Sequence, residues 1–246
     1  MTPDRNQETI EDLQYKGLKI IQNKACFCFG MDAVLLSSYV RLRRGDRVLD
    51  FCTGSGIVPI LLSGQNKAKE LIGIELLDYI ADMGMRSVAL NGLEDKLKII
   101  KGDVKKAHQL VDGVFDVITV NPPYEKENEQ RQSPNDYLKA ARHEVHITFK
   151  DICKTANRML KCGGRLTLVQ RVVRLPEMMS TMRAHNLEPK RMRLVHSTVD
   201  KPPILVLLEA VKDGREGLKV DPPLIVRTKG GEYTKEIDRI YHRDEE

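Results

Sequence analysis

The stretch FDVITVNPPYEK, residues 115–126, joins an apolar run to a rigid polar end. Five of its first six residues are apolar or β-branched, which predicts a buried strand. Asn121, Pro122, Pro123 and Tyr124 follow at once. Asn121 offers a side-chain carbonyl, Pro122 a backbone carbonyl with no N–H beside it, and Tyr124 a ring for stacking. These groups can hold a planar group that carries an amine. The alternative is that the segment is simply a strand that ends in a Pro-Pro turn and has no ligand.

A glycine-rich turn lies upstream, in the segment LDFCTGSGIVP. It holds Asp50, Thr53, Gly54 and Gly56 between an apolar run and a helical pattern. Glycine allows a sharp turn and a close approach of a ligand to the main chain, and the N-terminus of a helix favours negative charge. The dinucleotide fingerprint would need glycine at Pro59, so this is a different turn. A tight strand-to-helix turn without a ligand is the alternative.

Acidic residues end the next two predicted strands. Glu75 follows the glycine turn by about 20 residues, the spacing expected of an acid that binds ribose. Asp103 ends the third strand. Ligands of open α/β sheets bind at the carboxyl ends of the strands, so Asp50, Glu75 and Asp103 should line one crevice with the glycines. Any one of these acids alone would more often be a helix cap or a turn residue.

Strands and helices alternate from residue 47 onward. Strands are expected at 47–52, 70–75, 97–103, 115–120, 165–170, 190–197 and 204–212, and helices at 31–42, 56–65, 77–92, 104–111, 148–164 and 175–187. This order predicts an α/β fold with a mostly parallel seven-stranded sheet and helices on both faces. The last two strands have no helix between them and should pair as a hairpin, which gives an antiparallel edge strand.

The first part of the chain precedes this alternation. Residues 1–15 are expected to form a polar, partly helical arm, and residues 18–30 a hairpin or an irregular lid. No composition break and no internal repeat divides the rest. We therefore expect a single domain, with an N-terminal extension or lid at 1–45 packed on a catalytic domain at 46–246.

The bulk composition excludes several classes of protein. The chain has 246 residues, 41% hydrophobic and 30% charged, and no apolar run approaches the ~18 residues that span a bilayer. Its polar start is not a secretory signal, so cytoplasmic localisation is expected. Five scattered cysteines form no disulfide framework and no metal site. The net charge of +5 is compatible with a nucleic-acid partner, and the oligomeric state, monomer or dimer, stays open.

The spacing of the glycine turn and the acids resembles the Rossmann-like class I methyltransferases that use S-adenosyl-L-methionine and release S-adenosyl-L-homocysteine. The resemblance implies that Gly54 and Gly56 pass close to the methionine part of the cofactor. Glu75 would accept hydrogen bonds from the ribose and Asp103 from the adenine amine. Asp50 and Thr53 would position the cofactor through the turn.

In that fold the fourth strand presents the reactive atom of the substrate. The NPPY segment resembles that of amino-methyltransferases, whose substrates are exocyclic amines of nucleic-acid bases or protein glutamine. The resemblance implies that the carbonyls of Asn121 and Pro122 hold the amine hydrogens, that Pro123 stiffens the loop, and that Tyr124 stacks on the base. Catalysis would then be mostly positioning, without a strong general base.

Further segments narrow the resemblance to small-domain methyltransferases. FGMDAVLLSSY, residues 29–39, resembles the segment that covers the cofactor, with Phe29 and Asp32 at the flanking positions. Arg142, within ARHE, is a candidate contact to phosphate or base, and Arg171 and Arg174 at another strand end are candidate phosphate contacts. The basic stretch 190–196 is a further candidate. A solvated surface role is the alternative for each.

Over residues 15–243 the chain is similar to the bacterial family that methylates N6 of the adenine beside the anticodon of a valine tRNA. This implies an RNA substrate whose base is splayed into the pocket. A protein-glutamine methyltransferase of the release-factor type shares NPPY, but residues 1–45 are too few for the helical domain that docks its protein substrate. Another rRNA or DNA amino-methyltransferase, or a binding module without activity, are the remaining alternatives.

Overall fold

The computed structural model of the 246-residue chain describes residues 4–24, 28–122 and 147–243. Its strands are β1 (Glu8–Asp12), β2 (Lys19–Asn23), β3 (Arg47–Phe51), β4 (Glu70–Glu75), β5 (Leu97–Lys101), β6 (Phe115–Val120), β7 (Leu160–Arg171), β8 (Leu187–His196), β9 (Pro203–Lys212), β10 (Lys219–Val220) and β11 (Leu224–Ile225). The α-helices are α1 (Met31–Tyr39), α2 (Ile57–Gly64), α3 (Asp78–Leu90), α4 (Ala107–Leu110), α6 (Phe149–Met159), α7 (Leu175–Ala184) and α8 (Lys235–Ile240). Short 3-10 helices are η1 (Arg5–Gln7), η2 (Val104–Lys106) and η3 (Val172–Arg174).

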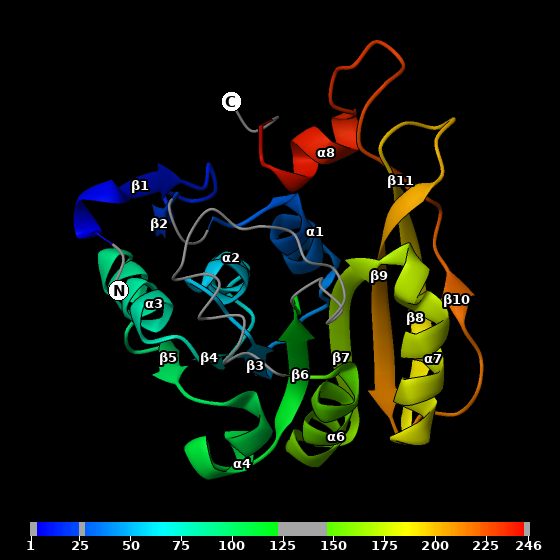
Figure 1. Ribbon diagram of the computed structural model, residues 1–246, viewed down its shortest axis with the longest axis horizontal. Coiled ribbons are helices and arrows are strands. Elements are labelled where there is room, and N and C mark those ends of the chain that lie inside the picture. Colours follow the sequence, from blue (N-terminus) through cyan, green and yellow to red (C-terminus); the bar gives the residue numbers. More distant parts are fainter. Residues whose placement is uncertain (1–3, 25–27, 123–146, 244–246) are drawn as a thin grey trace.

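One large sheet forms the centre of the molecule (Figure 1). Its long strands run in the order β5-β4-β3-β6-β7-β9-β8, and the two-residue strands β10 and β11 pair with β8. The pairs from β5 to β7 are parallel, whereas β9 is antiparallel to both β7 and β8. The α/β class and the β8–β9 hairpin are confirmed. The antiparallel strand is not the edge strand, because β9 lies between β7 and β8.

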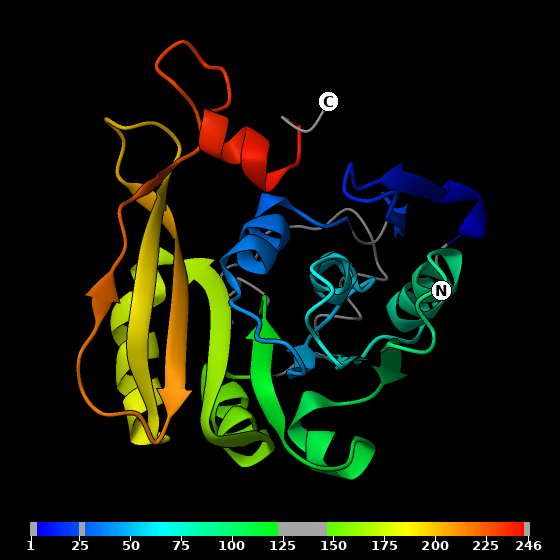
Figure 2. The same ribbon diagram turned by 180° about the vertical axis from the view of Figure 1, so that it is seen from behind.

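Helices cover both faces of the sheet, as the alternation predicts (Figures 1 and 2). One apolar core joins the sheet to α1, α2, part of α3, and α8. The other joins it to α4, α6 and α7. The two cores follow from the period of two along the strands: in β3, Val48 belongs to the first core, and Leu49 and Phe51 to the second. None of the helices in the described part of the chain has the length and apolar character of a membrane span.

The N-terminal segment forms a hairpin of β1 and β2 that packs on α3 (Figure 1). Glu8 accepts hydrogen bonds from Arg86 Nη1 at 2.7 Å and Nη2 at 2.8 Å, and from the Tyr79 hydroxyl at 2.7 Å. These contacts lower the pKa of Glu8, with the Arg86 hydrogen bond as the largest cause. Ile21 N–H also donates to the buried Ser87 hydroxyl at 3.0 Å. The hairpin is thus attached to the main sheet through α3.

Two elements differ from the prediction. β1 falls within the stretch expected to be a partly helical arm; its polar sequence, ETIED, shows no apolar alternation because none of its residues is buried and polar contacts such as Glu8 with Arg86 hold it in place. The helix expected at 148–164 ends at Met159, where β7 begins. The pairing of β6 with β7 then shifts between Phe115 and Val117, so that Gly163 and Gly164 lie in an irregular part of β7 and do not cap the helix.

Candidate cofactor and substrate site

The glycine turn joins β3 to α2 through three residues in the left-handed region. Cys52, Gly54 and Gly56 have φ values of 54°, 60° and 88°. Gly56 is the N-cap of α2, and its N–H donates to the Thr53 carbonyl at 3.0 Å. The two glycines adopt this backbone without steric cost, whereas Cys52 does so against the preference of a residue with a Cβ. The turn therefore curls back over the carboxyl end of β3.

Glu75, the last residue of β4, holds the turn in place. Its Oε2 accepts the Gly54 N–H at 2.9 Å and its Oε1 accepts the Leu77 N–H at 3.0 Å. The side chain is buried, and desolvation raises its pKa despite these hydrogen bonds. The backbone N–H of Leu76 also interacts with this carboxylate; because each oxygen has two acceptor positions, capacity remains for a hydroxyl donor of a ligand.

Asp50, in β3, lies beneath the same turn. It accepts the Thr53 hydroxyl at 2.6 Å and also the hydroxyl of Thr119 in the neighbouring strand β6. The pKa of Asp50 is raised to about 7, mainly because burial desolvates the carboxylate, with a smaller contribution from the Glu75 carboxylate. Among the described residues, no salt bridge to Asp50 or Glu75 is found. A ligand that brings positive charge and hydroxyl donors would suit these two buried carboxylates.

The other expected cofactor residues lie at the same edge or at the start of α1. Asp103 follows β5, caps η2 by accepting the Lys105 N–H at 2.9 Å, and is half-buried. Phe29 is half-buried; its N–H donates to Gln22 Oε1 at 3.0 Å. Asp32 lies in the first turn of α1 and accepts the Ala33 N–H at 3.0 Å. The aromatic ring of Phe29 packs against the first core.

Asn121 and Pro122 directly follow β6, at the carboxyl edge of the sheet. Because Phe51 of β3 pairs with Val120 of β6, the strand ends that lead to the glycine turn and to Asn121 are neighbours. Asn121 is half-exposed and Pro122 is buried. The structure therefore brings Asn121 next to the glycine turn, as the topology predicts. Pro123, Tyr124 and Arg142 lie outside the described residues.

The basic candidates differ in how much they interact within the protein. Arg174 forms a salt bridge with Glu177 at 3.0 Å, and its side chain is only 14% exposed. Arg171 ends β7 and is exposed. The expected basic stretch in β8 is largely used internally: Arg193 binds both oxygens of Glu236 at 2.7 and 2.9 Å, and Arg191 pairs with Asp221. These two β8 arginines serve the packing of β8 against the C-terminal segment.

Two residues of the site were missed at the sequence level. Thr119 lies in the middle of the apolar run of β6, where its hydroxyl had no evident role. Gly73, in β4, pairs with Asp50; a Cβ there would lie 2.6 Å from Thr53 Oγ1 and 2.8 Å from Ile99 Cδ1. A glycine inside a strand is a signal of close approach by another part of the chain, so this position could have been found. Thr119 could not, because its role depends on which strand lies beside it.

The arrangement has the properties of a cofactor crevice at the carboxyl edge of the sheet. Three strand ends supply acids, the turn supplies backbone close to a ligand, and a fourth strand end supplies Asn121. The two buried carboxylates fit a cationic ligand with a ribose, because they are oriented by the protein and not neutralised by an arginine or lysine within the described residues. No cluster of metal-ligating side chains is found in the part of the chain that the structure describes.

Comparisons with known proteins agree with this geometry. The chain is 28% identical over 157 residues to the tRNA1(Val) (adenine(37)-N6)-methyltransferase of Bacteroides thetaiotaomicron, a match that covers 63% of this chain and 65% of that protein. It is 23% identical to the protein of the same name from Parabacteroides distasonis, over 94% of this chain and 92% of the relative. The match thus spans just under two thirds of the first protein and nearly the whole of the second.

A solved structure shows the same fold. The crystal structure of a predicted O-methyltransferase from Agrobacterium tumefaciens superimposes with a TM-score of 0.70 and 24% identity, over 86% of this chain and 96% of that chain. At this identity the likeness supports the Rossmann-like architecture alone. The sequence profile described as methyltransferase small domain matches residues 18–186, which include β3 to β7 and the whole crevice. The chain therefore belongs to the methyltransferase small domain family.

Proposed function

We propose that the protein is an S-adenosyl-L-methionine-dependent methyltransferase that modifies N6 of an adenine in the anticodon loop of a tRNA, beside the anticodon of a valine tRNA. The observation that carries the proposal is the position of Asn121, at the end of β6 and next to the glycine turn of β3. The names of both curated relatives, which specify adenine 37 and N6, support the same substrate. A tRNA substrate also agrees with the expected cytoplasmic location.

Residues on three strand ends would hold the cofactor, which supplies a methyl group on a sulfonium when bound. Glu75 has acceptor capacity left for ribose hydroxyls after its bonds to Gly54 and Leu77. Asp103 would accept from the adenine amine, while Asp50 keeps Thr53 and the turn in position. Gly54 and Gly56 have no Cβ, which would let the methionine part approach the main chain closely. Phe29 and Asp32, in the extension at 1–45, would flank the opening.

Asn121 and Pro122 would hold the reacting amine. An exocyclic amine is a weak nucleophile because its lone pair is delocalised into the base. Two carbonyl acceptors that bind its hydrogens favour a pyramidal nitrogen and direct its lone pair out of the ring plane. Pro122 has no N–H to compete with the amine for these acceptors. Pro123 and Tyr124 complete the proposed motif, and Arg142, Arg171 and Arg174 are proposed contacts to the RNA.

A methyl-transfer assay on unmodified bulk tRNA, followed by digestion to nucleosides and mass spectrometry, tests the proposal. N6-methyladenosine is the expected product. The same assay with release-factor protein tests the glutamine alternative, which shares NPPY. Methyl groups found only on protein, or only on another base, would refute the adenine assignment, and absence of cofactor binding in calorimetry would refute every enzymatic reading.

The role of Asn121 is tested by Asn121→Ala. Loss of one of the two acceptors should lower kcat by at least about 100-fold, while the Kd of S-adenosyl-L-methionine changes by less than about 3-fold, because the amide acts on the substrate and not on the cofactor. Asn6→Ala, an exposed asparagine of η1, is the control and should behave as wild type. A near-normal rate in Asn121→Ala would show that another group positions the amine.

A further inference from the structure

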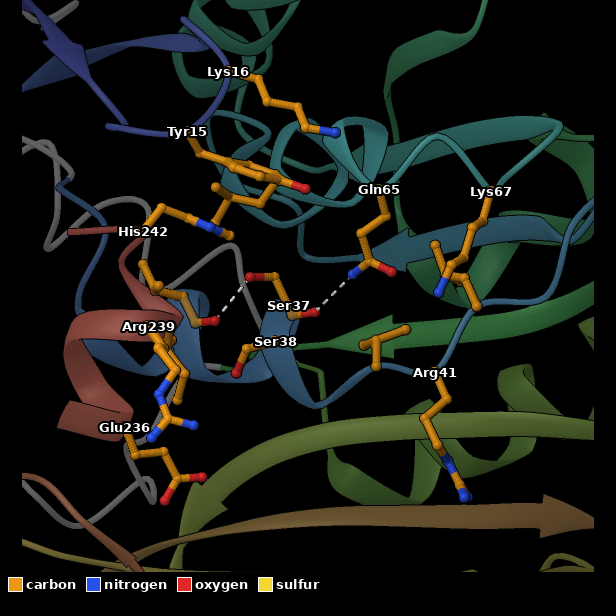
Figure 3. A pocket seen from close by; sticks show the side chains of 15 residues that line it. Tyr15, Lys16, Ser37, Ser38, Arg41, Gln65, Lys67, Glu236, Arg239 and His242 are labelled. Atoms are coloured by element: carbon orange, nitrogen blue, oxygen red, sulfur yellow. Dashed lines mark hydrogen bonds between the residues drawn. The ribbon is translucent and has the colours of Figure 1, made fainter. Parts of the chain in front are cut away.

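A second pocket lies away from the crevice, between α1, the end of α2, the β1–β2 turn and α8 (Figure 3). It is open to solvent and has a volume of about 690 Å³. Its lining comes from four segments that are distant in sequence: 15–16, 34–42, 61–67 and 236–242. The Gln65 amide donates to the Ser37 carbonyl at 3.4 Å, which joins the end of α2 to the last turn of α1. The pocket is therefore built by the tertiary fold.

Cationic side chains dominate the polar lining of this pocket. Lys16, Arg41, Lys67 and Arg239 contribute to it, with one carboxylate, Glu236. Figure 3 shows these side chains around the same opening. Glu236 binds the arginine of β8 at position 193 through both of its oxygens, which offsets its charge. The pocket thus has an excess of positive charge and favours an anionic ligand.

Among the described residues, no carboxylate forms a salt bridge with either lysine of the pocket, Lys16 or Lys67. Lys16 Nζ donates to the backbone carbonyl of Gly64 at 2.7 Å, a partner without formal charge. For Lys67, which is exposed, no salt bridge is found among the described residues. Arg41 differs because it pairs with the buried Glu209. The two lysines are consequently available for a phosphate, which a lysine binds as a point charge.

Two stacked aromatic rings line one side of the pocket. The rings of Tyr15 and His242 are stacked, with centroids 3.9 Å apart and an interplanar angle of 10°. His242 has a φ of 55°, so the chain turns sharply after α8 and places this ring against the β1–β2 turn. The stack joins the N-terminal hairpin to the C-terminal segment and fixes the wall beside Lys16.

We propose that this pocket binds backbone phosphates of the RNA substrate, at a distance from the methylated base. The proposal rests on the proposed function. α2 begins at the glycine turn and its eight residues end at the pocket, so the two sites are separated by about 12 Å along the helix. A polyanion of several nucleotides is long enough to reach both. The arginines at 191 and 193 in β8 are paired with carboxylates, so the pocket supplies cations that β8 does not.

The test measures binding of unmodified tRNA to Lys16→Ala/Lys67→Ala and to Lys67→Ala alone, over a range of salt concentrations. For the double variant we expect a Kd about 10-fold higher or more, and a slope of log K against log salt that is lower by about two. The single variant should lower the slope by about one. In turnover, KM for tRNA should rise while kcat at saturating tRNA stays near wild type.

A matched control removes two exposed lysines from the opposite face of the sheet, Lys98→Ala/Lys154→Ala. It should leave tRNA affinity within about 2-fold of wild type. Thermal unfolding and the Kd of S-adenosyl-L-methionine, measured on all variants, establish that the fold and the crevice are intact. Equal loss of tRNA affinity in the pocket and control variants would overturn the proposal, since it would indicate a general charge effect.

Two further outcomes separate the proposal from its alternatives. If wild type methylates tRNA but the pocket variants bind tRNA as tightly as wild type, the pocket is not an RNA site although the proposed function stands. If inorganic pyrophosphate saturates the wild-type pocket at micromolar concentration without displacing tRNA, the anion is a small phosphorylated molecule and the RNA assignment is wrong. If wild type fails to methylate any tRNA, the proposed function fails instead.

Discussion

The carboxylate of Glu75 accepts the backbone N–H of Gly54 at 2.9 Å, and so links the end of β4 to the turn that follows β3. The acid that resemblance assigns to the ribose is therefore also a structural part of the glycine turn. A buried N–H that loses its acceptor costs about 1–3 kcal/mol. If Glu75 binds the ribose as proposed, binding and folding depend on the same side chain.

We expect Glu75→Gln to destabilise the protein even without cofactor. Both oxygens of Glu75 accept an N–H, so the NH2 group of glutamine would face one of these donors. The free energy of unfolding should fall by roughly 1–3 kcal/mol in urea titration. Glu70→Gln, at the other end of β4, removes a partly exposed salt bridge to Arg47 and should cost no more than about 1 kcal/mol. Unchanged stability in Glu75→Gln would contradict the structural role of this carboxylate.

The raised pKa of Asp50 predicts how the free energy of unfolding depends on pH. Its pKa in the folded protein is about 7, above the ordinary value of 3.8, so between these values the folded state binds more protons than the unfolded state. The contribution of Asp50 to the free energy of unfolding therefore decreases as pH rises from about 4 to about 7. The total change is at most about 4 kcal/mol, since a tenfold change in proton affinity is worth about 1.4 kcal/mol.

The matched variant is Asp50→Asn, which cannot ionise. The difference in unfolding free energy between wild type and this variant, measured without cofactor from pH 4 to pH 8, should decline with rising pH and level off above pH 7. A difference that is constant with pH would show that Asp50 is already ionised in the folded protein at pH 4. Affinity of wild type for the cationic cofactor should rise over the same interval.

Cys52 carries backbone strain that glycine would relieve. Its φ of 54° lies in the left-handed region, which costs a residue with a Cβ about 1–2 kcal/mol. In Cys52→Gly this gain offsets the added entropy of the unfolded chain, about 0.4–1 kcal/mol, so stability should stay within about 1 kcal/mol of wild type. Cys52→Val should lose more than about 1 kcal/mol, because β-branched residues avoid this region.

The control for the valine substitution is Cys162→Val, at an exposed position of β7 that is not among the residues with positive φ, so that valine is accommodated without strain. It should leave the melting temperature nearly unchanged. Affinity for S-adenosyl-L-methionine should fall in Cys52→Val and not in Cys52→Gly. Equal stability of Cys52→Gly and Cys52→Val would mean that the conformation of the turn is not strained at this residue.

The ion pair of Arg41 and Glu209 predicts that losing Arg41 alone destabilises the protein more than losing both charges. Glu209 is 1% exposed, whereas Arg41 is 58% exposed. Arg41→Met would leave a buried acceptor without its partner; because Arg41 itself is exposed, the expected loss is that of an unsatisfied buried group, about 1–3 kcal/mol in the free energy of unfolding. Adding Glu209→Gln removes the uncompensated charge and should restore most of this loss. A double variant no more stable than Arg41→Met would show that the ion pair is not the source of the effect. For this reason Arg41 is not used to test the pocket.

The fold could be predicted where the hydrophobic period of a segment and the turn or capping residues at its ends agree. Apolar runs with intervening helical patterns gave the order of β3 to β7, and the missing helix between β8 and β9 gave their pairing. The position of β9 could not be predicted, because hairpin pairing does not fix which member lies inside the sheet. β1 could not be predicted, because a hairpin held by polar contacts, such as Glu8 with Arg86, has no alternating pattern of apolar residues.

The site could be predicted to the extent that it lies at strand ends. Asp50, Glu75 and Asn121 meet at one edge because parallel strands end together. Resemblance assigns roles to these residues, and those roles await the experiments above. The second pocket could not be predicted, since it depends on contacts between the first and last parts of the chain, such as Tyr15 with His242. Likewise, spacing alone cannot show that arginines of β8 are already paired.

The internal position of β9 has a consequence for biosynthesis. β7 and β8 do not pair with each other; each pairs with β9, residues 203–212, on the side between them. During translation both strands emerge from the ribosome before the strand that joins them. Until then, each presents an open row of backbone donors and acceptors, the kind of edge that pairs with other chains. Completion of the sheet therefore waits for a late segment, and chains truncated before residue 203 should be the aggregation-prone form of this protein.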